Sequence, residues 1–134
     1  MKNIEKILPT AIDAVKKFVI PENQSEVPKE FNGYISSFGA SVISSGLLPT
    51  IVFFSQAGKS KGDRRSVINA LEYIVSKEFP GTINTNEKIV SKVTEMVKAN
   101  QSMNRLEEKL NEAAIALKLA IRIFPKSKKD SNHE

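Results

Sequence analysis

The chain has 134 residues, of which 40% are hydrophobic and 26% are charged, and its formal net charge is +5. This length suits one domain with a core of its own, and the lack of cysteine excludes disulfide bonds and cysteine-ligated metal sites. No apolar run approaches the ~18 residues that cross a bilayer, and residues 1–10 do not form a signal peptide, so we expect a cytoplasmic protein.

Helical periodicity organises the first part of the chain. Apolar residues at steps of three and four predict a first helix over 4–19 and a second that begins at Pro28 and ends at Gly46. Pro9 should delay the start of the first helix or kink it, and the polar segment 21–27 indicates a linker. Pro28 suits a first helical turn because its missing N–H costs nothing there. Gly46 suits a helix C-cap.

Residues 47–54 (LLPTIVFF) are locally ambiguous. Periodicity does not separate a buried strand from a short buried helix in so brief an apolar run. Isoleucine, valine and phenylalanine favour a strand, whereas Pro49 favours the start of a helix. We predict a helix, because every neighbouring element is helical and a lone strand would leave its backbone groups unpaired.

Three further helices are predicted in the second half. Asp63 suits the N-cap of a fourth helix, which the sequence Phe-Pro-Gly at 79–81 ends. Thr85 or Asn86 would cap a fifth helix. Ser102 would cap a long sixth helix that reaches position 124, where the following proline stops it.

The sixth helix has two apolar sides. Ile115, Leu119 and Ile123 form the second side. A helix that is apolar nearly all round either lies centrally in a core or meets a partner, and the sequence leaves both readings open. The main side repeats in a heptad-like seam: Met103, Leu106, Leu110, Ala113, Leu117, Ala120 and Phe124.

Together these elements predict an all-α fold. We expect a compact bundle of about six helices that forms a single domain over residues 1–125. Residues 126–134 are polar, charged and terminal, and we expect them to form a disordered basic tail.

Catalytic motifs are incomplete. Residues 57–60 (AGKS) resemble the end of a phosphate-binding P-loop, but Phe53 takes the place of the glycine that this motif requires. His133, the sole histidine, lies too near the end of the chain to anchor a triad or a metal. Glu108 and Glu112 share a helix face without the histidine of a carboxylate-bridged metal centre. We therefore expect that the protein is not an enzyme and that it uses no metal, cofactor or small-molecule substrate. A small nucleotide hydrolase that uses Gly58, Lys59 and Ser60 is kept as a further hypothesis.

The excess positive charge lies in two segments. Residues 59–65 hold four basic groups and one acid, and residues 118–134 hold five basic groups and two acids, so each carries a net charge of +3. An excess of basic over acidic residues favours a polyanionic partner such as nucleic acid. Charge alone is equally compatible with an ordinary solvated surface.

Residues 31–54 (FNGYISSFGASVISSGLLPTIVFF) carry a family signal. They resemble the helix–Gly–LLPT–apolar signature of the small subunit of the Cmr (type III-B CRISPR) RNA-guided effector complex, and the resemblance extends over about 30–124. It implies a non-catalytic helical bundle that stacks with further copies of itself in a minor filament. It also implies binding to other Cmr subunits and contact with guide or target RNA along a basic face.

The expected RNA contact is electrostatic, because lysine and arginine track phosphates without reading sequence. Bases stack on exposed aromatic side chains, but most aromatic residues of this sequence should be buried, and Tyr34 is the one candidate for an accessible ring. The alternative hypothesis is a helical protein–protein adaptor with no RNA role, which would use the second apolar side of 113–124. The candidate RNA-binding residues are Lys59, Lys61, Arg64 and Arg65, with Lys16 and Lys17 as secondary candidates.

Overall fold

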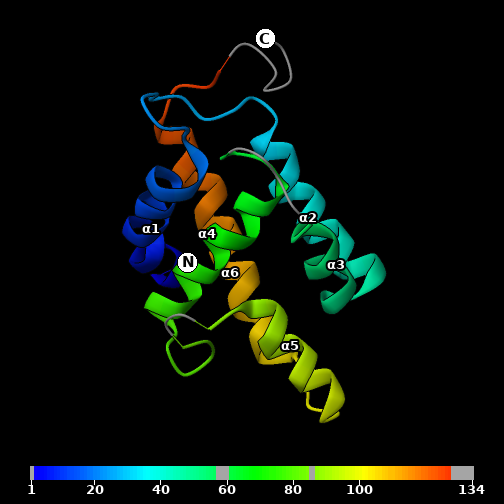
Figure 1. Cartoon of the computed structure of the whole chain (residues 1–134). Helices are drawn as coiled ribbons and strands as arrows, with labels where there is room; N and C mark the ends of the chain where they lie inside the picture. Colours follow the sequence, from blue (N-terminus) through cyan, green and yellow to red (C-terminus); the bar gives the residue numbers. More distant parts are fainter. Residues whose placement is uncertain (1, 57–60, 85–86, 128–134) are drawn as a thin grey trace.

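The structure is a computed structural model that describes residues 2–56, 61–84 and 87–127. Within these ranges no strand forms, and the predicted all-α bundle of six helices in a single domain is confirmed. The helices are shown in Figure 1: α1 (Lys2–Ala14), the π-helix η1 (Val15–Val19), α2 (Phe31–Ser45), α3 (Leu47–Phe54), α4 (Arg64–Glu78), α5 (Ile89–Lys98), α6 (Asn104–Ala120) and the 3₁₀ helix η2 (Ile121–Ile123).

Helix α6 forms the centre of the bundle and packs most extensively against α1, and then against α4 and α2. Both helices bury small residues: Ala11 and Ala14 on α1 and Ala113 and Ala120 on α6 are fully buried. Short side chains let two helix backbones approach closely. The predicted seam is confirmed, since Leu106, Leu110, Ala113, Leu117 and Ala120 belong to the core and Met103 and Phe124 pack against it.

The first helix runs through Pro9, so the predicted late start is wrong. Pro9 and Glu5, the residue whose carbonyl loses its helical partner, both lie on the exposed side. The freed carbonyl is therefore on the side of the helix that water reaches. The chain continues from α1 into η1 and leaves it at Ile20, whose N–H donates to the carbonyl of Val15 at 3.0 Å.

The second helix begins at Phe31, so the predicted start at Pro28 is also wrong. Pro28 is buried, and its carbonyl accepts a hydrogen bond from the N–H of Phe31 at 3.1 Å, in the turn that precedes α2.

Residues 47–54 form the helix α3, as predicted, after a break at Gly46. Gly46 has a φ of 94°, which glycine adopts without strain, and its N–H caps α2 by donating to the carbonyl of Val42 at 3.0 Å. The Thr50 hydroxyl donates to the Gly46 carbonyl at 2.8 Å and lies 2.7 Å from the Ser41 hydroxyl. These bonds join α3 to α2 around a single glycine.

The linker after η1 pairs with the segment 125–127 that follows η2. The Val27 N–H donates to the carbonyl of Pro125, and the Ser127 N–H donates to the carbonyl of Val27, each at 2.8 Å. Val27 and Lys126 thus form an isolated parallel bridge. The first two residues of the predicted tail are ordered by this pairing, and residues 128–134 lie outside the described part of the chain.

Candidate nucleic-acid interface

The basic segment leads into the N-terminus of α4, where Asp63 is the predicted cap. Its carboxylate accepts hydrogen bonds from the backbone N–H of Arg65 at 3.0 Å and of Ser66 at 3.3 Å, which confirms the prediction. Arg64 and Arg65 follow the cap and are exposed. Because the cap occupies the N–H groups at this helix end, a phosphate that approaches here meets the arginine side chains.

Gly62 fixes the path of this segment. Its φ is 91°, and a Cβ there would lie 2.3 Å from the ring Cγ of Pro28 and 3.0 Å from the carbonyl oxygen of Val19. Its N–H donates to the Ser66 hydroxyl at 2.8 Å. The segment therefore lies tightly against the end of η1, with Lys61 half-buried beside it. Lys59, the fourth candidate, lies outside the described residues.

The Arg64 guanidinium lies over an aromatic ring. Its Cζ is 4.5 Å from the centroid of Phe53, in the last turn of α3. Phe53 is 47% exposed. Tyr34 was the aromatic residue expected to be accessible, but it is half-buried and packs against the core. The position of Phe53 was missed, since nothing in a uniformly apolar run marks its solvent-facing member.

Lys16 and Lys17 are exposed on η1, which packs against α4. The Lys17 Nζ lies 5.7 Å from the centroid of the Tyr73 ring, and the Lys77 Nζ lies 5.4 Å from it. Arg64 and Tyr73 are nine positions apart on α4, or about two and a half turns, so their side chains leave the helix on opposite sides. The structure thus places two of the candidates, Arg64 and Lys17, at separate sites.

The group around Tyr73 borders a hollow of about 340 Å³ that also contains the carboxylates of Glu72 and Glu87. Burial raises the pKa of Glu72, an effect opposed by the hydrogen bond from Ile89 and by the charges of Lys88 and Arg65. Glu72 has a structural partner, because its Oε2 accepts the N–H of Ile89, the first residue of α5, at 2.8 Å. Lys77 and Lys88 also line the hollow, so its two acids offset two lysines and leave no excess of cations in the lining.

The caps of the last two helices differ from those predicted. Thr85 and Asn86 lie outside the described residues, and α5 begins at Ile89 with Glu72 from α4 as its cap. Ser102 lies close to its predicted role, since its hydroxyl accepts the Asn104 N–H at 3.3 Å at the start of α6.

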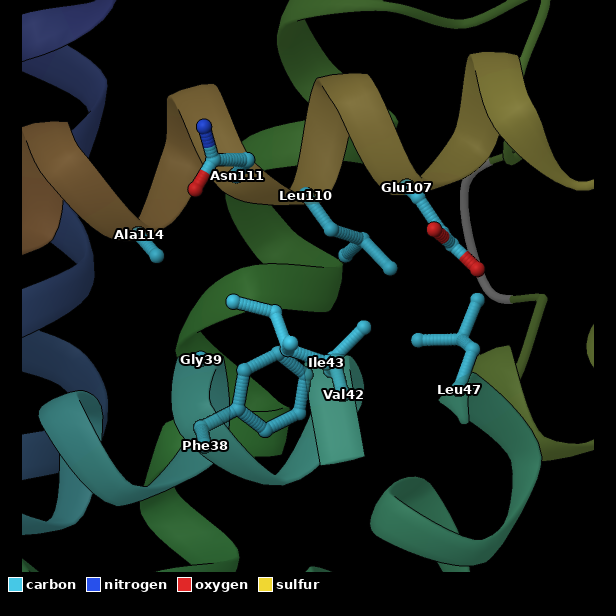
Figure 2. A pocket seen from close by; sticks show the side chains of 9 residues that line it. All are labelled: Phe38, Gly39, Val42, Ile43, Leu47, Glu107, Leu110, Asn111 and Ala114. Carbon is cyan, nitrogen blue, oxygen red and sulfur yellow. The ribbon is translucent and has the colours of Figure 1, made fainter. Parts of the chain in front are cut away.

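A second surface is apolar and lies between α2 and α6. Figure 2 shows Phe38, Val42 and Ile43 of α2 facing Leu110 and Ala114 of α6 across a pocket of about 360 Å³. Glu107 and Asn111 contribute its polar groups. Ile43 is 89% exposed, the most exposed large apolar side chain among the described residues. The Lys118 Nζ donates to the Ser36 hydroxyl at 2.8 Å and joins the same two helices beyond the pocket.

The second apolar side of α6 is exposed. Ile115 is 36%, Leu119 37% and Ile123 59% exposed. Ile115 follows Asn111 of the pocket by four residues and Leu119 follows Ile115 by four, so the apolar side continues along α6 from the pocket. The apolar seam of this helix therefore belongs to the core, and its second apolar side lies on the surface.

Catalytic and metal-binding groupings are sparse in the part of the chain that the structure describes. No cluster of three or more potential metal ligands occurs there. Glu108 is exposed, and Glu112 is half-buried with one oxygen 3.7 Å from the Lys109 Nζ. The segment before residues 57–60 is the helix α3, whereas a P-loop follows a strand. None of the described helices is long and apolar enough to span a membrane.

These features define a small all-helical protein with a basic surface at the start of α4 and a separate apolar surface on α2 and α6. The family model described as CRISPR-associated protein (Cas_Cmr5) matches residues 5–118, so the chain belongs to this family. The resemblance of residues 31–54 to the Cmr small subunit is confirmed. No significant match to the chain is found among curated proteins or among solved structures.

Proposed function

We propose that this chain is a non-catalytic small subunit of a type III-B CRISPR (Cmr) ribonucleoprotein effector complex in the cytoplasm, where it serves antiviral defence. The observation that carries the proposal is the family match over residues 5–118. The subunit stacks with further copies of itself in the minor filament, binds the other Cmr subunits and contacts target RNA. It needs no cofactor and no small-molecule substrate.

The RNA contact is assigned to the start of α4. Arg64 and Arg65 are exposed there beside Lys61, and the one acid among them, Asp63, is engaged by two backbone N–H groups. Lysine and arginine side chains bind phosphates with high salt sensitivity and no sequence preference. The contact is therefore electrostatic, and it suits a subunit that must accept any target sequence.

Contacts with neighbouring subunits are assigned to the apolar surface. The pocket between α2 and α6 and the exposed side of α6 offer aliphatic side chains such as Ile43 and Leu119. Exposed apolar surface of this kind marks protein–protein contact sites. The apolar surface and the basic segment share no residue, so the subunit can bind protein and RNA together.

Affinity purification of the tagged chain from its own cell tests the proposal. We expect several larger CRISPR-type subunits by mass spectrometry and a uniform small RNA after extraction of the eluate. Recovery of the chain alone, or with one unrelated protein and no RNA, would contradict the proposal.

The second candidate function is a helical adaptor with no RNA role. The observation that favours it is the exposed apolar side of α6, formed by Ile115, Leu119 and Ile123. The two functions differ in RNA affinity, because an adaptor would bind its protein partner without binding single-stranded RNA even at low salt.

A further inference from the structure

Phe53 is exposed but held in a fixed position. It sits in the last turn of α3, and its ring meets the ring of Phe54 edge-on, with centroids 5.7 Å apart and an interplanar angle of 74°. Phe54 is buried and meets the buried Phe38 of α2 edge-on at 5.4 Å. Edge-to-face pairs of this kind are favourable beyond the area that they bury. The core therefore orients a ring that is 47% exposed.

A cationic group lies beside this ring. The Arg64 guanidinium is 4.5 Å from the ring centroid, and a guanidinium is planar, weakly hydrated and suited both to stacking and to bidentate contact with phosphate. Arg65 is the next residue, and the carboxylate of Asp63 is turned to the backbone as a cap. One exposed aromatic ring and two arginines thus share the α3–α4 junction.

This pairing fits single-stranded nucleic acid. Such ligands bind by stacking bases on aromatic faces while basic side chains follow the phosphates. Aromatic and arginine side chains also occur at protein interfaces, but the excess of cations over acids favours a polyanion here. The hollow beside Tyr73 has no such excess in its lining, because Glu72 and Glu87 offset Lys77 and Lys88 there.

We propose that Phe53 and Arg64 form a stacking platform for one base of single-stranded RNA, with Arg64 and Arg65 binding the flanking phosphates. The inference rests on the proposed RNA contact. It goes beyond that contact, because an electrostatic interaction with phosphates needs no aromatic ring.

The test measures binding of the full-length chain to a fluorescein-labelled, unstructured 12-nucleotide RNA by fluorescence anisotropy at several salt concentrations. An abasic oligonucleotide with the same number of phosphates is the second probe. We expect Phe53→Leu to weaken RNA binding about 5- to 150-fold, the usual range for one stacked base. The salt dependence should not change, because the variant neutralises the same phosphates. The preference for RNA over the abasic probe should also fall.

Matched variants separate stacking from charge. Phe53→Tyr keeps an aromatic face and should bind as the wild type does. Val52→Ala alters a neighbouring apolar residue on the same helix, which is 48% exposed, and should leave affinity unchanged. Arg64→Ala should lower the slope of log affinity against log salt by about 0.7, the value for one phosphate on a single strand. Thermal unfolding verifies that each variant is folded.

The possible failures are distinguishable. If the wild-type chain binds RNA and Phe53→Leu binds equally well, the platform is wrong and the electrostatic contact stands. If the wild-type chain shows no binding at 50 mM salt, both the platform and the RNA part of the proposed function are wrong. If Phe53→Leu keeps its RNA affinity but no longer co-purifies with its protein partners, Phe53 belongs to a protein interface and the platform is overturned.

Discussion

Gly62 shows how one residue determines where a functional segment lies. Its positive φ is costly for other residues, and the space that a side chain would need is filled by Pro28 and the backbone of Val19. Lys61 and Arg64 stand on either side of this close approach. The position of the basic side chains therefore depends on a residue that carries no charge.

We expect Gly62→Ala to lower the free energy of unfolding by about 2–4 kcal/mol, since backbone strain and overpacking add. Urea denaturation followed by circular dichroism measures the change. The matched control is Gly33→Ala, because a Cβ at this position on α2 meets nothing within 4 Å. It should stabilise the chain by about 0.5–1 kcal/mol. Equal effects of the two substitutions would contradict the account of Gly62.

The stability contributed by Glu72 should depend on pH. Its folded-state pKa is raised by burial, so the native state holds this proton more tightly than the unfolded chain does. The contribution is then greatest at low pH and falls as pH rises through the ordinary glutamate pKa, about 4.3, toward the raised value. Lys88, Arg65 and Glu87 are the charged neighbours.

Glu72→Gln removes the titration and keeps an oxygen that accepts the Ile89 N–H. We expect the wild type to lose stability relative to this variant as the pH rises from about 4 to 7, measured by urea denaturation at each pH. A difference that stays constant across this range would show that Glu72 titrates as it does in the unfolded chain.

At the scale of elements, sequence patterns predicted the helices better than their boundaries. The periodicity of α6 and the cap at Asp63 are local features, and the structure bears out both. The cap of α5 comes from Glu72, seventeen positions away, so no local pattern reveals it. The exposure of Phe53 likewise follows from which side of α3 meets α2, and only tertiary packing decides this.

The two apolar sides of α6 should respond differently to truncation. Leu117 is fully buried and Leu119, two residues later, is 37% exposed. We expect Leu117→Ala to cost about 2–5 kcal/mol of stability and Leu119→Ala to change it by no more than about 0.5 kcal/mol. Thermal or urea unfolding of the isolated chain measures both. A large decrease in stability with Leu119→Ala would mean that this side is part of the core.

At the scale of the molecule, charge is local rather than general. The net charge of +5 includes +3 from residues 59–65. The basic residues of this segment that the structure describes lead into α4, where Arg64 lies over the Phe53 ring. The placement of Arg64 and Lys17 on opposite sides of α4 was not accessible from sequence, because η1 and α4 meet only in the folded chain.

Replacing Lys61, Arg64 and Arg65 together by alanine should weaken binding to single-stranded RNA. The slope of log affinity against log salt should fall in magnitude by up to about 0.7 for each phosphate that is no longer neutralised. The control replaces Lys6, Lys98 and Arg105, which are exposed elsewhere, and removes the same total charge. Anisotropy titrations over a range of salt concentrations compare the two. Equal decreases in affinity would indicate that net charge, and not the basic segment, governs binding.

The order in which the chain is made adds a consequence to the packing of α1 on α6. The first helix packs mainly against the last, and Val27 pairs with Pro125 and Ser127. The apolar face of α1 therefore meets part of its native cover in α4, and the rest only when α6 leaves the ribosome, roughly 90 residues after α1. At 5–20 residues per second this interval lasts about 5–18 s. Nascent chains of this protein thus carry a first helix that is only partly covered for several seconds, and the bundle closes only when α6 has been made.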